Sequence, residues 1–148
     1  MNIEQVLEMW KTDSIIDDLK LDDTTIKMAR IHSKYLELIT IAKMAKKKKE
    51  LDYKILLKNK WLYYGSKLSK EQLDELGWEY DPYKGLNKPL KGQMNYYYDA
   101  DSDIQKMQAL VEYDKVLIET LEEIMNTIRW RHQNIGNIIK WRSFEAGA

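Results

Sequence analysis

The sequence predicts a mostly α-helical fold in which long helices flank an irregular middle segment. Glycine and proline, the residues that break helices most strongly, number six and two in the 148-residue chain. Both prolines and four of the glycines fall between residues 65 and 92, so the stretches 1–64 and 93–135 are almost free of helix breakers. Lysine, glutamate, leucine and methionine, which favour helices, are abundant in those two stretches.

The first predicted helix covers residues 2–11. Asn2 and Gln5 have the spacing of a capping box, in which each residue satisfies a free backbone N–H of the other. Apolar side chains follow at helical intervals, and the polar run 12–14 then interrupts the pattern.

A long helix is predicted next, from Asp23 or Thr24 to Tyr64. At 1.5 Å per residue it would be about 60 Å long. An apolar stripe runs along this predicted helix. A stripe that long needs a partner, either the second helical arm or another subunit. The stripe has heptad spacing and consists of Met28, Ile31, Tyr35, Leu38, Ala42 and Ala45.

The middle segment starts with a second capping box, formed by Ser69 and Gln72. Gly77 is expected to end this short helix, because glycine readily adopts the left-handed conformation found after helix ends. Residues 78–98 are expected to form a loop with one short strand at 95–98.

The second long helix is expected to begin at Asp101 or Asp103. Its apolar surface is wider than one helix–helix seam, so we expect it to contact other subunits as well as the first arm. The residues expected at this oligomerisation surface are Ile104, Met107, Leu110, Val111, Leu117, Ile118, Leu121, Ile124, Met125 and Ile128. The chain is thus interpreted as one domain (1–148), with N-terminal helices over 1–68, a connector over 69–100 and an oligomerisation helix over 101–148.

Several classes of protein are disfavoured by composition. The chain has no cysteine, which excludes disulfides and cysteine-ligated metals. No apolar run approaches the ~20 residues needed to cross a bilayer, and five acids in the first twenty residues argue against a signal peptide. His32 and His132 stand alone, and no phosphate loop or hydrolase motif is present. We therefore expect no catalytic site, no metal site, no cofactor and no membrane association.

One basic block interrupts an otherwise acidic chain. The net charge is zero, yet residues 41–68 contain nine lysines and two acids, a net charge of +7. Lysines attract the phosphate backbone, and interleaved aromatic rings can stack on unpaired bases. The residues expected to bind DNA are Lys47, Lys54, Lys58, Lys60, Trp61, Tyr63, Tyr64 and Lys67. The alternatives are a solvated lysine-rich surface, and aromatic residues that belong to a core.

Helix geometry divides this block between two faces. At ~100° per residue, Lys43, Lys47, Lys54 and Lys58 share one face with Trp61. Lys60 lies roughly 200° from Lys58. Either the helix loosens near residue 60, or a bound strand is held from two sides.

Three short segments, taken in order, resemble the UvsY recombination mediators of tailed bacteriophages. They are Ser33–Leu36, Leu57–Lys60 followed by Tyr63 and Tyr64, and the ending Arg142–Gly147 with its Phe-Glu-Ala-Gly sequence. The resemblance covers most of the chain and is weakest over 65–95.

This resemblance implies a homo-oligomeric ring of seven subunits that binds single-stranded DNA. It also implies that the ring helps a RecA-like phage recombinase load onto DNA covered by a single-strand-binding protein, in the cytoplasm of the infected bacterium. The family's DNA-contacting basic pair falls on Lys58 and Lys60, and its assembly element is the C-terminal helix. The main alternative is a structural coiled-coil or phage assembly protein whose lysines only make it soluble.

Overall fold

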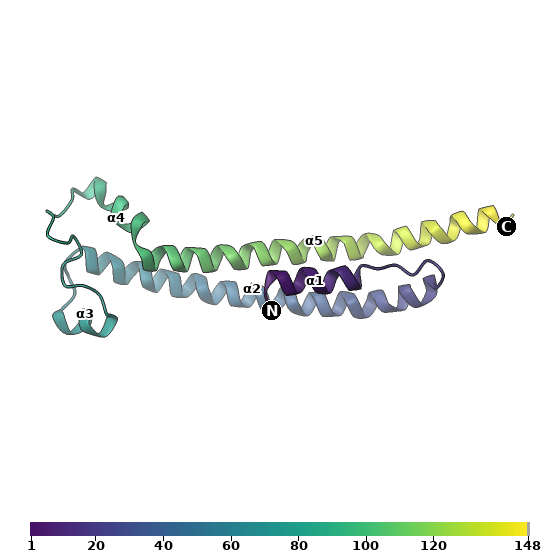
Figure 1. Cartoon of the computed structure of the whole chain (residues 1–148), viewed down its shortest axis with the longest axis horizontal. Helices are drawn as coiled ribbons and strands as arrows, with labels where there is room; N and C mark the ends of the chain where they lie inside the picture. The colour runs from purple at the N-terminus through teal and green to yellow at the C-terminus, as the bar shows by residue number, and fades with distance from the viewer. Residues whose placement is uncertain (148) are drawn as a thin grey trace. The chain divides into compact units, whose positions relative to one another are not determined.

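The computed structural model describes residues 1–147 and is built from helices. The elements are α1 (Ile3–Asp13), α2 (Leu21–Tyr64), α3 (Lys70–Leu76), the 3-10 helix η1 (Lys91–Gln93), α4 (Met94–Ala100) and α5 (Ser102–Glu145), shown in Figure 1. No strand occurs among these described residues, and the predicted mostly α-helical class is confirmed.

Contacts group the chain into two compact units, each built from several helices. The terminal unit comprises Met1–Ala45 with Tyr113–Ala148, and the middle unit comprises Lys46–Glu112. Both α2 and α5 contribute to each unit, because the boundaries fall inside these two 44-residue helices.

Helix α1 begins where the sequence predicts it. The Asn2 side chain accepts a hydrogen bond from the Gln5 N–H at 2.8 Å, and the Gln5 side chain accepts one from the Asn2 N–H at 3.0 Å. The capping box is therefore complete. The helix continues to Asp13, slightly beyond the predicted end, and Ser14 caps it.

The terminal unit has a three-helix core. Helix α1 lies against α2 and α5 (Figure 1), and buried side chains from all three meet in one cluster. Tyr35 is fully buried, its ring packs edge-on to Trp10 at 5.5 Å, and its hydroxyl donates to Asp13 at 3.0 Å. The cluster comprises Val6, Leu21, Met28, Tyr35, Ile39, Ala42, Leu117, Ile118, Leu121, Ile124, Met125, Ile128 and Ile135.

Helix α1 is a second partner of α5 within the same chain, beside α2. Six of the ten residues expected at the oligomerisation surface lie in the terminal unit's own core: Leu117, Ile118, Leu121, Ile124, Met125 and Ile128. They are covered there by α1 and α2 of the same chain. Ile104 is buried in the middle unit, Met107 and Val111 are half-buried, and Leu110 is exposed. A role for these ten in assembly stays a prediction.

The middle unit has a separate, aromatic core. Tyr63, Tyr64, Leu73 and Tyr83 are buried there. Partly buried side chains pack around them: Leu68, Trp78, Met94, Tyr97 and Tyr98. Both predictions for α3 are confirmed: Ser69 and Gln72 form its capping box, and Gly77 ends it with a left-handed φ of 71°.

The predicted short strand at 95–98 is wrong. These residues belong to α4, which follows η1 directly. Tyrosine favours strands, but that preference depends strongly on context. Here the helix brings Tyr97 and Tyr98 onto the same aromatic neighbour, with ring centroids 6.0 and 5.4 Å from the Tyr64 ring.

Candidate nucleic-acid interface

A stripe of exposed lysines runs along α2 in the middle unit. Lys47, Lys54 and Lys58 are exposed, and in the described part of the chain none of the three makes an ion pair. Their spacing of seven and four residues places them on one face of the unbroken helix. We call these three residues the lysine stripe. A face of like charges without counterions suits a polyanion.

Lys60 points the opposite way and is buried. Its side chain is 4% exposed, and its ammonium lies 3.0 Å from Asp101 and 2.8 Å from Asp103 at the start of α5. The same ammonium sits 4.0 Å from the centre of the Trp78 ring. Helix α2 stays regular to Tyr64, so it does not loosen near residue 60. Lys58 and Lys60 therefore occupy different environments.

Two of the expected stacking residues belong to the aromatic core. Tyr63 and Tyr64 are 8% and 6% exposed, and Tyr63 packs on Trp78 with ring centroids 5.0 Å apart. The Tyr83 hydroxyl donates to the Tyr64 carbonyl, and the Tyr64 hydroxyl donates to Asp101 at 2.7 Å. Burial, followed by the hydrogen bond to Asp101, raises the pKa of Tyr64 well above its usual range. Tyr64 therefore remains a hydrogen-bond donor at neutral pH.

Trp61 and Lys67 are the remaining expected residues, and both are accessible. Trp61 is 54% exposed, and the Lys67 ammonium lies 4.4 Å from the centre of its ring. Trp61 follows Lys58 by about one helical turn. The structure thus gathers the lysine stripe, Trp61 and Lys67 at the surface of one unit, and places Lys60, Tyr63 and Tyr64 beneath that surface.

Asp101 organises the buried side of this region and was not singled out as a site residue. As the residue before α5, it accepts hydrogen bonds from the Asp103 and Ile104 N–H groups, each at 3.0 Å. Burial favours the neutral form, but the Tyr64 hydroxyl, the Ile104 N–H and the Lys60 ammonium outweigh it and lower the pKa of Asp101. The available sequence signal was an aspartate at a helix N-cap, which alone does not identify a salt-bridge partner.

Acid should therefore weaken the middle unit through Asp101. A carboxylate with a lowered folded-state pKa stabilises the fold above its unfolded pKa of about 3.9, and this contribution disappears as pH falls through the folded-state value. As the pH drops below about 4, we expect the melting temperature of the wild type to decrease. In Asp101→Asn the melting temperature should decrease less steeply with pH. Asparagine caps helices as well as aspartate does. Thermal melts followed by circular dichroism test this, and equal pH slopes would contradict it.

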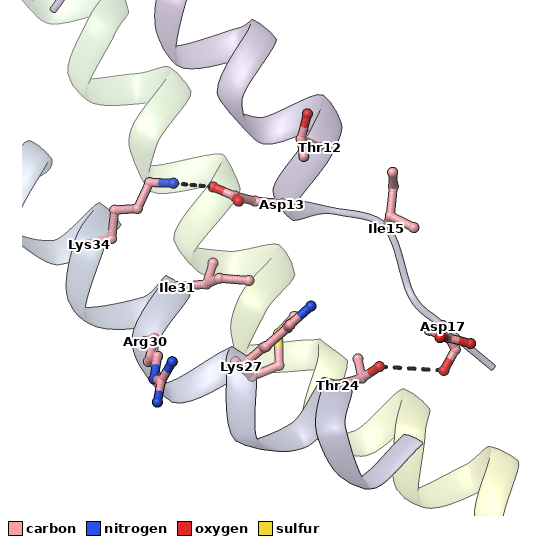
Figure 2. Close-up of a pocket in the computed structure, with 10 residues that line it drawn as sticks. Thr12, Asp13, Ile15, Asp17, Thr24, Lys27, Arg30, Ile31 and Lys34 are labelled. Carbon is pink, nitrogen blue, oxygen red and sulfur yellow. Dashed lines mark hydrogen bonds and ion pairs between the residues drawn. The ribbon is translucent and has the colours of Figure 1, made fainter. Parts of the chain in front are cut away.

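A second group of cations lines a pocket in the terminal unit. Figure 2 shows Lys27, Arg30 and Lys34 around this pocket of about 500 Å³, near the end of α1. Lys34 points at Asp13 and pairs with it at 2.6 Å, and the Asp17 carbonyl accepts from the Thr24 hydroxyl at 3.4 Å. The mixed charge of this pocket suits a phosphate backbone less well than the lysine stripe does.

Two general features of the described residues bear on function. Within residues 1–147 no helix is long and apolar enough to cross a membrane. The same residues contain no group of three histidine, cysteine or acidic side chains placed to hold a metal ion.

Comparisons with known proteins agree with one another. The family profile described as "Recombination, repair and ssDNA binding protein UvsY" matches residues 9–148. The recombination protein uvsY of Enterobacteria phage T4 is 26% identical over 147 residues, 99% of each chain.

Solved structures of the bacteriophage T4 recombination mediator protein UvsY have the same fold. One crystal form superposes with a TM-score of 0.84 at 24% identity, covering 99% of this chain and 98% of the other. A second gives a TM-score of 0.81 at 23% identity, covering 95% and 98%. A third gives 0.78 at 23% identity, covering 98% and 99%.

Proposed function

The chain belongs to the UvsY family of recombination, repair and single-stranded-DNA-binding proteins, and on that premise we propose that it is a single-stranded-DNA-binding recombination mediator. It would help a RecA-like phage recombinase load onto DNA covered by single-strand-binding protein, in the cytoplasm of the infected host. Family membership also agrees with the expectation that the chain is not an enzyme.

The observation that carries the proposal is the lysine stripe beside an exposed indole. Three cations without counterions can each neutralise a phosphate, and Trp61 lies one turn further along the same helix. Backbone charge plus a flat ring binds single strands with little sequence preference. In this proposal Lys47, Lys54, Lys58, Trp61 and Lys67 contact DNA.

The buried members of the expected set have a supporting role in this proposal. Lys60 joins the end of α2 to the start of α5 inside the middle unit, through Asp101 and Asp103. Tyr63 and Tyr64 belong to the aromatic core of the same unit. They hold the DNA-contacting face in place without needing to touch the strand.

We further propose that the protein acts as a homo-oligomeric ring of seven subunits. Helix α5 exposes several large apolar side chains near its end, and soluble proteins rarely leave contiguous apolar patches uncovered. These side chains are Trp130, Trp141 and Phe144, between 62% and 72% exposed. A ring would place several copies of a weak DNA site on one strand and raise the affinity through effective concentration.

The DNA-binding proposal predicts that affinity for single-stranded DNA falls steeply with salt concentration. Lys54 and Lys58 should account for part of this dependence. Each phosphate neutralised on a single strand contributes about −0.7 to the log–log slope of affinity against salt. The double variant Lys54→Ala with Lys58→Ala should bind labelled oligo-dT more weakly, with a slope flatter by about 1.4 for each occupied subunit. Fluorescence anisotropy at several salt concentrations measures both quantities.

Lys48→Ala provides the matched control, because Lys48 is exposed on the same helix but lies outside the stripe. Lys48→Ala should reduce the affinity less than Lys54→Ala or Lys58→Ala does. Wild-type protein that binds oligo-dT weakly, or independently of salt, would contradict the mediator proposal. It would favour a structural assembly protein whose lysines are only solvated.

A further inference from the structure

A basic groove opens in the middle unit where the lysine stripe ends. Its volume is about 480 Å³, and it is bounded by the end of α2, the segment before η1, and α4. Trp61 and Tyr98 contribute rings to its lining, and Lys67, Lys88 and Lys91 contribute cations. No acidic side chain lines this groove.

Two of the three cations of this groove are available to a ligand. Lys88 and Lys91 are exposed and make no ion pair in the described part of the chain. Lys67 already lies over the Trp61 ring, where the ring's electron-rich face attracts a cation. The groove therefore combines a half-exposed indole with three positive charges.

Two other pockets among the described residues lack this combination. The terminal-unit pocket in Figure 2 contains Asp13 and Asp17 beside its cations. A neighbouring middle-unit pocket, lined by Tyr83, Leu86 and Tyr96, has Lys84 as its single cation. A nucleotide of single-stranded DNA presents one flat base and two flanking phosphates, which match one ring and several lysines.

We propose that this groove is a nucleotide site in which one base of a bound single strand stacks on Trp61. The flanking phosphates pair with Lys88 and Lys91, and the strand continues onto the lysine stripe. This inference rests on the proposed function, which supplies the DNA, and extends the DNA-contacting surface from Trp61 and Lys67 to Lys88 and Lys91. The groove would set the position at which the bound DNA strand departs from helix α2.

Variants of Trp61 and of the two lysines test base stacking and phosphate binding separately. Trp61→Ala should lose about 5- to 150-fold in oligo-dT affinity, the equivalent of about 1–3 kcal/mol for one stacked base, with little change in salt slope. Trp61→Phe should retain most of the affinity but lose most of the tryptophan quenching that DNA causes. Lys88→Ala with Lys91→Ala should flatten the salt slope by about 1.4.

Matched controls come from the same unit. Tyr96→Ala removes an exposed ring of α4 that does not line the groove, and Lys106→Ala removes an exposed lysine of α5. Both should bind oligo-dT like wild type. Circular dichroism checks that each variant stays helical, as expected for surface substitutions.

The results distinguish this inference from the proposed function. If the Lys88/Lys91 variant binds like wild type while the Lys54/Lys58 variant is weakened, the groove is not a nucleotide site although the chain binds DNA, whatever Trp61→Ala does. If wild type does not bind oligo-dT, both proposals fail. Free dTMP should not displace labelled oligo-dT at concentrations where unlabelled oligo-dT does. Equal displacement would identify a free nucleotide as the occupant and overturn the assignment to DNA.

Discussion

Lys60→Ala is expected to destabilise the middle unit by about 3–5 kcal/mol, because removing one partner of a buried ion pair leaves the other charge unpaired. Asp101 would then be a buried carboxylate that retains the Tyr64 hydroxyl but no cation at 3.0 Å. The ammonium's contact with Trp78 would also be lost. A loss of this size is a large part of the ~5–15 kcal/mol that stabilises an ordinary domain.

Urea unfolding at one fixed protein concentration measures this effect, since assembly makes apparent stability depend on concentration. The exposed neighbour supplies the control, and Lys58→Ala should change the unfolding free energy by no more than about 0.5 kcal/mol. Asp101→Asn combined with Lys60→Ala should cost less than the two single changes together, because the neutral amide needs no cation.

Equal unfolding free energies for Lys60→Ala and wild type would contradict the supporting role. A Lys60→Ala variant that is fully stable yet binds DNA poorly would restore Lys60 as a direct DNA contact. The single variants are more informative than replacing Lys58 and Lys60 together, because the double change would mix lost DNA contact with lost stability.

These two lysines illustrate how far the sequence alone can go. Helix periodicity correctly separates their faces, since they lie about 200° apart. It does not reveal which face is buried, because the partners of Lys60 lie more than forty residues further along the chain. The family resemblance implies that Lys58 and Lys60 contact DNA together. Within the subunit, however, Lys58 is exposed and Lys60 is buried in an ion pair.

Local signals predicted the start of α1 and both ends of α3 well. Both capping boxes and the glycine at the end of α3 act through neighbours within three or four residues, which the sequence displays directly. Long-range packing was harder to predict. The breadth of the apolar face of α5 is visible in the sequence, but nothing in the sequence indicates that α1, more than a hundred residues away, covers part of it. The groove likewise joins Trp61 to Lys88 and Lys91 with no short-range motif.

Charges placed at the end of α5 are expected to disassemble the protein and weaken DNA binding by about 10²- to 10⁴-fold, the gain that multivalency can supply. Trp141 and Phe144 stack with ring centroids 5.8 Å apart, and both are largely exposed. Trp141→Glu with Phe144→Glu would place two carboxylates in this apolar patch, and burying them between subunits would be costly. Each isolated subunit should remain helical, because neither ring lies in the terminal unit's core.

Sedimentation velocity and oligo-dT anisotropy on the same samples measure assembly and affinity together. His132→Glu is the control, because His132 is exposed on α5 roughly 180° around the helix from Trp141.

Leu117→Glu with Ile124→Glu should instead unfold the terminal unit, since both side chains belong to its core. A Trp141/Phe144 variant that stays assembled would exclude this patch from the interface. One that becomes monomeric with unchanged affinity would show that each subunit binds DNA independently, without help from the ring.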